Sequence, residues 1–306
     1  MIDLEEEINS KMTRIWIPAN VGVVDETLVG YKGHTNNPHH VFIARKPNPH
    51  GLKNWSLVDF SGYFLGFSLF RRVKESGEPV YEVSHATVER MSKPLPLGSL
   101  VIADSYFGSV TALEKLAENE KYALFSCNKT HPSLLFKEGT GEKVKNNGDS
   151  ETVYGEVKWK DGETTVPFAA NSFLSEGRLL CTMTTVFSTD LVTTDTEILV
   201  PDGSEEVQMK QIQVEEKRPE ARVAYQNMMD LVDTADQLVG DALPTSRLKH
   251  WTAAEMWELI MLLIENGRKV FKSANGLRND QMSNSKWKGK VQRALLGLPE
   301  CNVSTH

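Results

Sequence analysis

Tyr225–Gln237 reads Tyr-Gln-Asn-Met-Met-Asp-Leu-Val-Asp-Thr-Ala-Asp-Gln, and the interpretation of the rest of the chain starts from this stretch. It follows Pro219 and contains no glycine or further proline, so it is predicted to be helical. Asp230, Asp233 and Asp236 are then three residues apart and lie along one face of that helix. Like charges at this spacing repel each other, and a bound cation would reverse the sign of that interaction. From this helix alone, two interpretations of the acidic face remain open: a solvated surface and a metal site.

The composition is typical of a soluble globular protein, with 40% hydrophobic and 25% charged residues among 306, enough for one large domain or two smaller ones. The longest apolar run, Leu259–Ile264, is far too short to span a membrane, and the acidic N-terminal sequence does not resemble a signal peptide. Cys127, Cys181 and Cys301 are widely spaced, which favours a reducing compartment over a disulfide framework or a CxxC zinc site.

The net charge of −7 conceals two basic segments. Residues 31–74 contain seven Lys or Arg against one acid, and residues 266–293 contain eight against one. Residues 138–220, between them, contain 17 acids and eight bases. The basic segments are compatible with an anionic ligand such as nucleic acid, and equally with ordinary surface charge.

The first half of the chain has the pattern of an α/β layer. Leu100–Ala103 is wholly apolar and ends at Asp104, which is typical of a buried strand with a carboxylate at its carboxyl end. Thr111 and Glu114 form a capping-box pattern that predicts the start of a helix. The expected elements are strands at 21–29, 41–44, 100–103 and 122–127, a hairpin at 55–71 that turns at Ser61-Gly62, and helices at 83–91 and 111–119.

Residues 128–218 interrupt this order. Glu138–Ser150 is rich in Gly, Asn, Lys and Glu and is expected to be a mobile loop. Strands are predicted at 153–159, 164–170 and 179–187, with a turn at Lys160–Gly162 between the first two. These strands predict a β-rich insertion.

The acidic helix, at 219–239, is followed by a second helix and a basic tail. Thr252–Lys272 is strongly apolar and is expected to be largely buried through Trp257, Leu259, Ile260, Leu263 and Phe271. The predicted domains are a first part of the core at 14–127, the β-rich insertion at 128–218, a second part of the core at 219–273, and the basic tail at 274–306.

Three acids lie where an active site built on a sheet and a helix would need them: Asp25 in the first strand, Asp104 at a strand end and Asp233 on the acidic helix. Carboxylates are hard oxygen ligands that suit Mg²⁺, which also accepts substrate phosphate oxygens. Two such ions activate a water or a 3′-hydroxyl and stabilise the leaving oxygen in phosphodiester chemistry. Any one aspartate alone is more simply explained as a cap or turn residue, so the arrangement carries the metal hypothesis.

Short motifs surround these acids. They are Val24-Asp25-Glu26 with Tyr31-Lys32-Gly33, Arg45-Lys46-Pro47 and His50-Gly51-Leu52-Lys53; Ala103-Asp104-Ser105-Tyr106-Phe107; Arg218-Pro219 with Tyr225 and Val232-Asp233-Thr234-Ala235-Asp236-Gln237; and Ser246-Arg247 with Trp251. In this order and spacing they resemble the transposase core of the piggyBac family and the proteins derived from it. The match covers about residues 14–272 and is specific only when all the motifs are taken together.

The resemblance implies an α/β fold of the ribonuclease-H-like type, a mixed sheet with flanking helices and a β-rich insertion. It implies that Asp25, Asp104 and Asp233 bind catalytic Mg²⁺, or Mn²⁺ in its place, with Asp236 as a fourth acid beside them. The family cuts DNA at element ends by hydrolysis and hairpin formation and joins those ends to target DNA. The same chemistry is therefore the expected activity of this core.

DNA is the partner that the resemblance implies, with contacts from Lys46, Lys53, Arg247, Lys249 and Trp251. For Trp251, anchoring the next helix in the core is the alternative. The resemblance also implies residence in the nucleus and leaves a homodimer open, and neither a membrane nor a small-molecule cofactor is expected.

The sequence departs from the family pattern in ways that keep a second function open. Asp230-Leu231 stands where the family has Gly-Gly, Gln226 where Asn is usual, and Ser105 where Asn usually follows the second acid. The family's N-terminal DNA-binding region and Cys-rich zinc-binding C-terminus are not found in this sequence, so autonomous transposition is not expected. The alternative is a domesticated or decayed transposon-derived protein that acts as a non-catalytic DNA-binding or interaction module.

Overall fold

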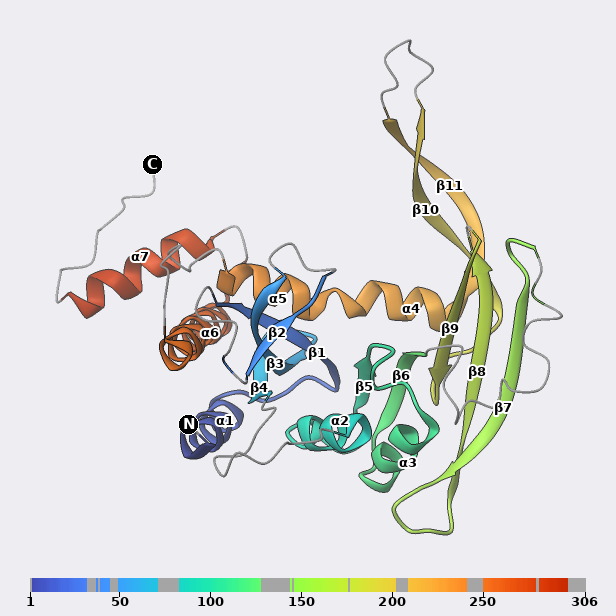
Figure 1. The fold of residues 1–306 in the computed structure, drawn as a ribbon, viewed down its shortest axis with the longest axis horizontal. Coiled ribbons are helices and arrows are strands. Elements are labelled where there is room, and N and C mark those ends of the chain that lie inside the picture. Colours follow the sequence, from blue (N-terminus) through green and yellow to red (C-terminus); the bar gives the residue numbers. More distant parts are fainter. Residues whose placement is uncertain are drawn as a thin grey trace. The chain divides into compact units, whose positions relative to one another are not determined.

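The chain divides into two compact units, whose elements are labelled in Figure 1. The computed structural model describes residues 2–31, 37, 39–44, 49–70, 83–127, 144, 146–175, 177–201, 209–240, 250–278 and 281–296. Unit 1 comprises Met1–Glu82, Met91–Pro96 and Asp230–His306, and unit 2 comprises Val83–Arg90 and Leu97–Met229. Both units combine strands with flanking helices, which confirms the expected α/β class.

The sheet of unit 1 is organised around β3 (His50–Asp59). One side of β3 pairs antiparallel with β1 (Val21–Gly30), and its other side pairs with β2 (His40–Phe42) and β4 (Phe64–Leu69). The expected hairpin is confirmed as β3–β4, and its turn contains Gly62 at φ 79°, a conformation that glycine adopts without strain.

Helices cover the strands of unit 1. The helix α1 (Ile2–Ile15) packs on β4, and α5 (Leu231–Gly240) and α6 (Trp251–Ala274) pack on β1. The helix α7 (Asn284–Leu295) packs on α6. Neither α1 nor α7 was expected from the sequence.

The outer edge of β4 is satisfied by two asparagine side chains. Asn9 of α1 accepts from the Phe67 N–H (3.0 Å) and donates to the Phe67 carbonyl (2.8 Å). Asn266 of α6 makes the same pair of bonds with Phe64, at 2.9 and 2.8 Å. The two side-chain amides thus make the backbone hydrogen bonds that a neighbouring strand would otherwise make.

The turn after β3 is built around a buried carboxylate. Asp59 is fully buried and accepts hydrogen bonds from the indole of Trp16 (2.9 Å) and from the backbone of Ala19, Ser61 and Tyr63 (3.1, 3.0 and 3.2 Å), and it also bonds the Ser61 hydroxyl. Trp16 stacks on Tyr63 at 4.8 Å. Burial, together with the negative charge of Asp59, raises the pKa of Tyr63 to about 12.

The helix α6 presents an unexpected face to the core. Leu259 is buried as expected, but Ile260 and Leu263 are 41% and 40% exposed. The side chains that turn inward instead include Glu255, Glu258, Glu265, Asn266 and Arg268. Glu255 and Asn266 bond with Asn54 and Phe64 of the strands, and Glu265 pairs with Arg268 on the helix itself. The helix is therefore held by polar contacts as well as by apolar packing.

Unit 2 begins with two parallel strands, β5 (Leu100–Ala103) and β6 (Tyr122–Cys127), joined by α3 (Val110–Glu118). The sheet continues from β6 through β9 and β8 to β7, all antiparallel. The strands expected within 128–218 therefore extend the β5–β6 sheet. Their bounds are β7 (Ser150–Lys158), β8 (Thr165–Ser175) and β9 (Arg178–Thr184).

A two-stranded ribbon and two helices complete unit 2. The ribbon pairs β10 (Leu191–Pro201) with β11 (Met209–Pro219) and was not expected from the sequence. Most of α2 (Ser84–Ser92) belongs to this unit, and α4 (Glu220–Met229) packs on β5, β6 and β9. The division into core, insertion and tail remains a prediction.

Two local predictions were wrong in detail. Ser109, and not Thr111, caps α3: its hydroxyl accepts from the Ala112 N–H at 3.2 Å. The acidic stretch predicted as one helix forms two, α4 and α5, with Asp230 between them. The Asp230 carbonyl accepts the first bond of α5 from the Thr234 N–H (2.9 Å), a position at which aspartate is a preferred residue.

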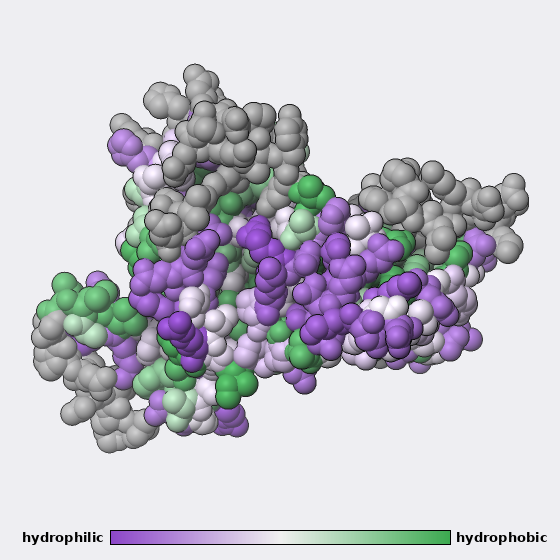
Figure 2. All heavy atoms as spheres, turned by 90° about the horizontal axis from the view of Figure 1, so that it is seen from below, coloured by the Kyte–Doolittle hydropathy of each residue, from purple (hydrophilic) through white to green (hydrophobic). Residues whose placement is uncertain are grey.

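Part of the expected loop at Glu138–Ser150, residues 138–143 and 145, lies outside the described residues. Figure 2 shows a face on which hydrophilic residues predominate and apolar ones form small, separate patches. Among the helices that the structure describes, none has both the length and the apolar character that crossing a membrane requires.

Candidate active site

Asp25 lies in the middle of β1, half-buried, directly opposite Ser56 of β3. Its carboxylate accepts a hydrogen bond from the backbone N–H of Glu26 at 2.8 Å. Successive side chains of a strand alternate between faces, so Asp25 shares its face with Thr27. The Thr27 and Ser56 hydroxyls are hydrogen-bonded at 2.8 Å, so the carboxylate lies on a strand face that is already polar.

Asp233 lies in the first turn of α5 and is exposed. The helix dipole favours a carboxylate at this end of a helix. Val232, Ala235 and Val239 are buried and hold α5 against β1 and β3. Asp25 and Asp233 therefore lie on two elements of unit 1 that pack together. Asp236 lies in the same helix, and its side chain is outside the described set.

Asp104 follows β5 in unit 2 and is held in a defined turn. Its carboxylate accepts from the Tyr106 N–H (3.0 Å), and its carbonyl accepts from the Phe107 N–H (3.1 Å). Phe107 is fully buried and anchors the turn. A Cβ on Gly108 would lie 2.1 Å from the carbonyl oxygen of Ser126, so only glycine allows the turn to approach β6 this closely.

The chemistry of these three aspartates suits a hard divalent cation, because each offers carboxylate oxygens. Asp25 and Asp233 belong to unit 1, and Asp104 belongs to unit 2. Within the described part of the chain, no three Asp, Glu, His or Cys side chains gather closely enough to hold a metal ion. The assignment of Asp25, Asp104 and Asp233 as ligands therefore remains a prediction.

Lys53 lies on the other face of the β1–β3 pair from Asp25. Its ammonium contacts the Glu26 carboxylate at 3.1 Å and lies 3.8 Å from the centre of the Trp55 ring. Both the charge and the aliphatic stem of Lys53 are thus engaged within unit 1. A DNA contact from Lys53 remains a prediction.

Trp251 begins α6 and packs against a buried cluster of Val29, Tyr31, Leu52 and Ala254. These contacts match the alternative role given to it from the sequence, that of a helix anchor. A role in base stacking remains a prediction. Lys46, Arg247 and Lys249 lie outside the described residues.

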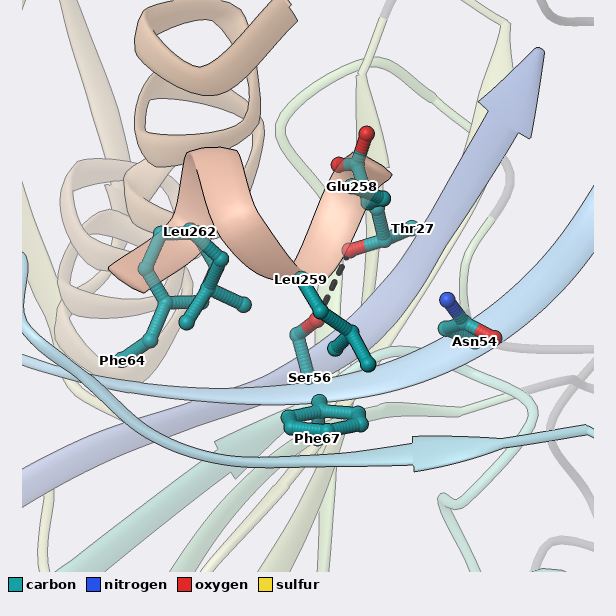
Figure 3. A pocket seen from close by; sticks show the side chains of 8 residues that line it. All are labelled: Thr27, Asn54, Ser56, Phe64, Phe67, Glu258, Leu259 and Leu262. Carbon is teal, nitrogen blue, oxygen red and sulfur yellow. Dashed lines mark hydrogen bonds between the residues drawn. The ribbon is translucent and has the colours of Figure 1, made fainter. Parts of the chain in front are cut away.

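A small cavity on the face of β1 that carries Asp25 was missed from the sequence (Figure 3). Its volume is about 10 Å³, room for one water molecule, and its lining residues are Thr27, Asn54, Ser56, Phe64, Phe67, Glu258, Leu259 and Leu262. Burial raises the pKa of Glu258 to about 7. The sequence did contain one indication of this cavity: the spacing of Glu255, Glu258 and Leu262 places all three side chains on one face of a helix.

The match of the chain to a family model defines the class of protein as a transposase core of the DDE type. The chain belongs to the family described as Transposase IS4, whose model matches residues 2–267. A comparison with curated proteins gives no match.

Among solved structures, the chain is similar to that described as a cryo-EM structure of the piggyBac transposase synaptic complex with hairpin DNA. The two chains are 15% identical with a TM-score of 0.67, over 97% of this chain and 61% of the other. This chain thus spans less than two thirds of that one. The predicted resemblance to a piggyBac-family transposase core and the ribonuclease-H-like fold are confirmed.

Proposed function

We propose that the chain is the catalytic core of a DNA transposase that cleaves DNA phosphodiester bonds and transfers the resulting ends to target DNA. Asp25, Asp104 and Asp233 are the proposed metal ligands, with Asp236 as a fourth acid. The observation that carries the proposal is the turn at Asp104. It fixes a half-buried carboxylate at the carboxyl end of a parallel strand, a position at which α/β sheets bind ligands.

Mg²⁺, or Mn²⁺ in its place, is the ion that suits this donor set. When bound, such an ion supplies activation of a water or a 3′-hydroxyl and stabilises the leaving oxygen. The chain's own residues position the carboxylates. The N–H of Tyr106 orients Asp104, the N–H of Glu26 orients Asp25, and the first turn of α5 carries Asp233.

Nicking of supercoiled DNA by the purified chain, in the presence of Mg²⁺ or Mn²⁺, tests this function. Asp104→Asn keeps the shape of the turn and removes the carboxylate charge. Loss of a direct ligand should lower the nicking rate by more than the roughly 10–100-fold typical of an outer-shell partner. Asp161→Asn is the matched control, because Asp161 is an exposed turn aspartate of the same unit.

The alternative, a non-catalytic DNA-binding or interaction module, predicts a different result. The chain would then bind duplex DNA without nicking it, and calorimetry would detect no Mg²⁺ or Mn²⁺ binding with or without DNA. Metal binding that Asp104→Asn abolishes would exclude that alternative.

Residence in the nucleus and assembly as a homodimer belong to the same proposal, because the activity requires access to DNA and acts on two ends. Fluorescence microscopy of the tagged chain tests the first. Light scattering on the purified chain, with and without DNA, tests the second.

A further inference from the structure

The helix α7 lies in a basic part of the chain that the proposed function leaves unused. Its 12 residues contain Lys286, Lys288, Lys290 and Arg293 and no acid, in a chain of net charge −7. The helix lies beyond residue 267, where the family match ends.

The structure fixes α7 firmly on unit 1. The indole N–H of Trp287 donates to the Ile264 carbonyl of α6 at 2.7 Å, and its ring packs on Phe271 at 5.3 Å. The Asn284 amide donates to the Leu238 carbonyl of α5 at 2.8 Å. The basic side chains are therefore carried on a positioned helix that is packed against α6 (Figure 1).

Three of the four cations form one stripe. Lys286, Lys290 and Arg293 are spaced i, i+4 and i+7, which places them within about 60° of arc at roughly 100° per residue. Lys288 lies on the opposite flank of the helix, about 170° from the middle of the stripe. The stripe therefore lies on one face of α7, and Lys288 provides a control substitution on the same helix.

The length of the stripe suits a nucleic-acid strand. Lys286 and Arg293 are seven steps apart at about 1.5 Å rise each, so the stripe extends about 10.5 Å along the helix. This is enough for its three cations to face separate phosphates, which follow one another at about 3.4 Å per strand along the DNA axis. We propose that Lys286, Lys290 and Arg293 form a phosphate-contacting surface that holds the backbone of duplex DNA. This inference rests on the proposed function and adds to it a DNA-positioning surface outside the aspartate site.

A salt titration of duplex binding by fluorescence anisotropy tests the surface. Each phosphate contact contributes about −0.9 to the slope of log K against log salt concentration. Replacing all three residues by Gln should make the slope less steep by about 2.7. Between about 50 and 200 mM salt, the factor by which affinity falls should then be roughly 40 times smaller for the variant than for the native chain. Lys286→Gln alone should change the slope by about 0.9, and Lys288→Gln should leave it unchanged.

The outcomes are distinct. If the triple variant keeps the native slope while the chain still nicks DNA, the surface is wrong and the proposed function stands. If Lys288→Gln weakens binding as much as Lys286→Gln, net charge and not the stripe is responsible, and the surface is wrong. If the native chain does not bind duplex at about 50 mM salt, both proposals fail. Unchanged Trp fluorescence of the triple variant would confirm that Trp287 keeps α7 in place.

Discussion

Units 1 and 2 both combine β-strands with covering helices, yet they bury different kinds of side chain. Among the described residues of unit 1, the buried charged side chains are Glu26, Asp59, Glu255, Glu258, Glu265, Arg268 and Lys272. Among the described residues of unit 2, Lys121 is the one buried charged side chain, and the layer between α3 and β6 is apolar. Unit 1 is therefore expected to depend on specific polar partners, and unit 2 mainly on apolar area.

The buried ion pair of α6 gives the largest expected difference. Arg268 contacts Glu265 at 2.5 and 2.8 Å, with side chains 5% and 2% exposed, and also donates to the Met282 carbonyl at 3.2 Å. Arg268→Met leaves a carboxylate buried without its partner. We expect the free energy of unfolding, measured by urea denaturation, to fall by about 3–5 kcal/mol.

The comparison pair is the exposed contact of Lys160 with Glu120 in unit 2, at 3.1 Å. Lys160→Gln should cost less than about 1 kcal/mol, because solvent screens the charges. The double variant of Arg268→Met with Glu265→Leu should recover most of the lost stability. An Arg268→Met chain as stable as the Lys160→Gln chain would remove the distinction between the two units.

The sequence predicted the apolar elements of unit 2 well. The strands β5 and β6 have the predicted bounds, and α3 differs by one residue at each end. These segments were predictable because an apolar run by itself identifies a buried strand or the buried face of a helix. Of the three aspartates that the motifs located, Asp104 follows one of these apolar strands, whereas Asp25 and Asp233 lie in unit 1. Their assignment as metal ligands remains a prediction.

Unit 1 was less predictable because its burial depends on contacts distant in sequence. Asn54 donates to Glu255 at 2.9 Å across 201 residues, and no local pattern reveals this. The apolar residues of α6 suggested a face containing Ile260 and Leu263, yet the carboxylates turned inward. The polar helix α7 lacks the apolar stripe that identifies a helix by pattern.

The carboxyl group of Glu258 gives a comparison that depends on pH. Burial raises its pKa from 4.5 to about 7, so the folded chain keeps a proton that the unfolded chain has released between those values. Stability should therefore fall as pH rises from about 4.5 through 7, by up to about 3 kcal/mol in total. Glu258→Gln stays neutral at every pH and removes this loss.

Urea denaturation from pH 5 to pH 8 measures this effect. The Glu258→Gln chain should match the native chain near pH 5 and exceed its stability at pH 8. Glu156→Gln, at an exposed glutamate of β7, should follow the native chain throughout. A parallel pH dependence of the Glu258→Gln and native chains would show that Glu258 is ionised in the fold.

The turns of two hairpins give the smallest and most closely matched difference. In both, an aspartate accepts hydrogen bonds from residues just after it. Asp59 of unit 1 is fully buried, whereas Asp161 of unit 2 is exposed and accepts from the Glu163 and Thr164 backbone at 3.0 and 2.7 Å. The bonds from Thr164, first that of its hydroxyl, lower the pKa of Asp161.

Replacing either aspartate by asparagine substitutes an NH₂ group for one oxygen. At Asp59 the new NH₂ group must face hydrogen-bond donors, either the Trp16 indole and the Ala19 N–H or the N–H groups of the turn. Those donors then lose their acceptor in a site that water does not reach. Asp59→Asn should therefore cost about 1–3 kcal/mol in a thermal or urea denaturation. Asp161→Asn should cost less, because its amide can turn toward water. Equal losses would mean that local turn geometry, and not burial of the charge, sets the strength of both hairpins, and the contrast between the units would then not extend to their turns.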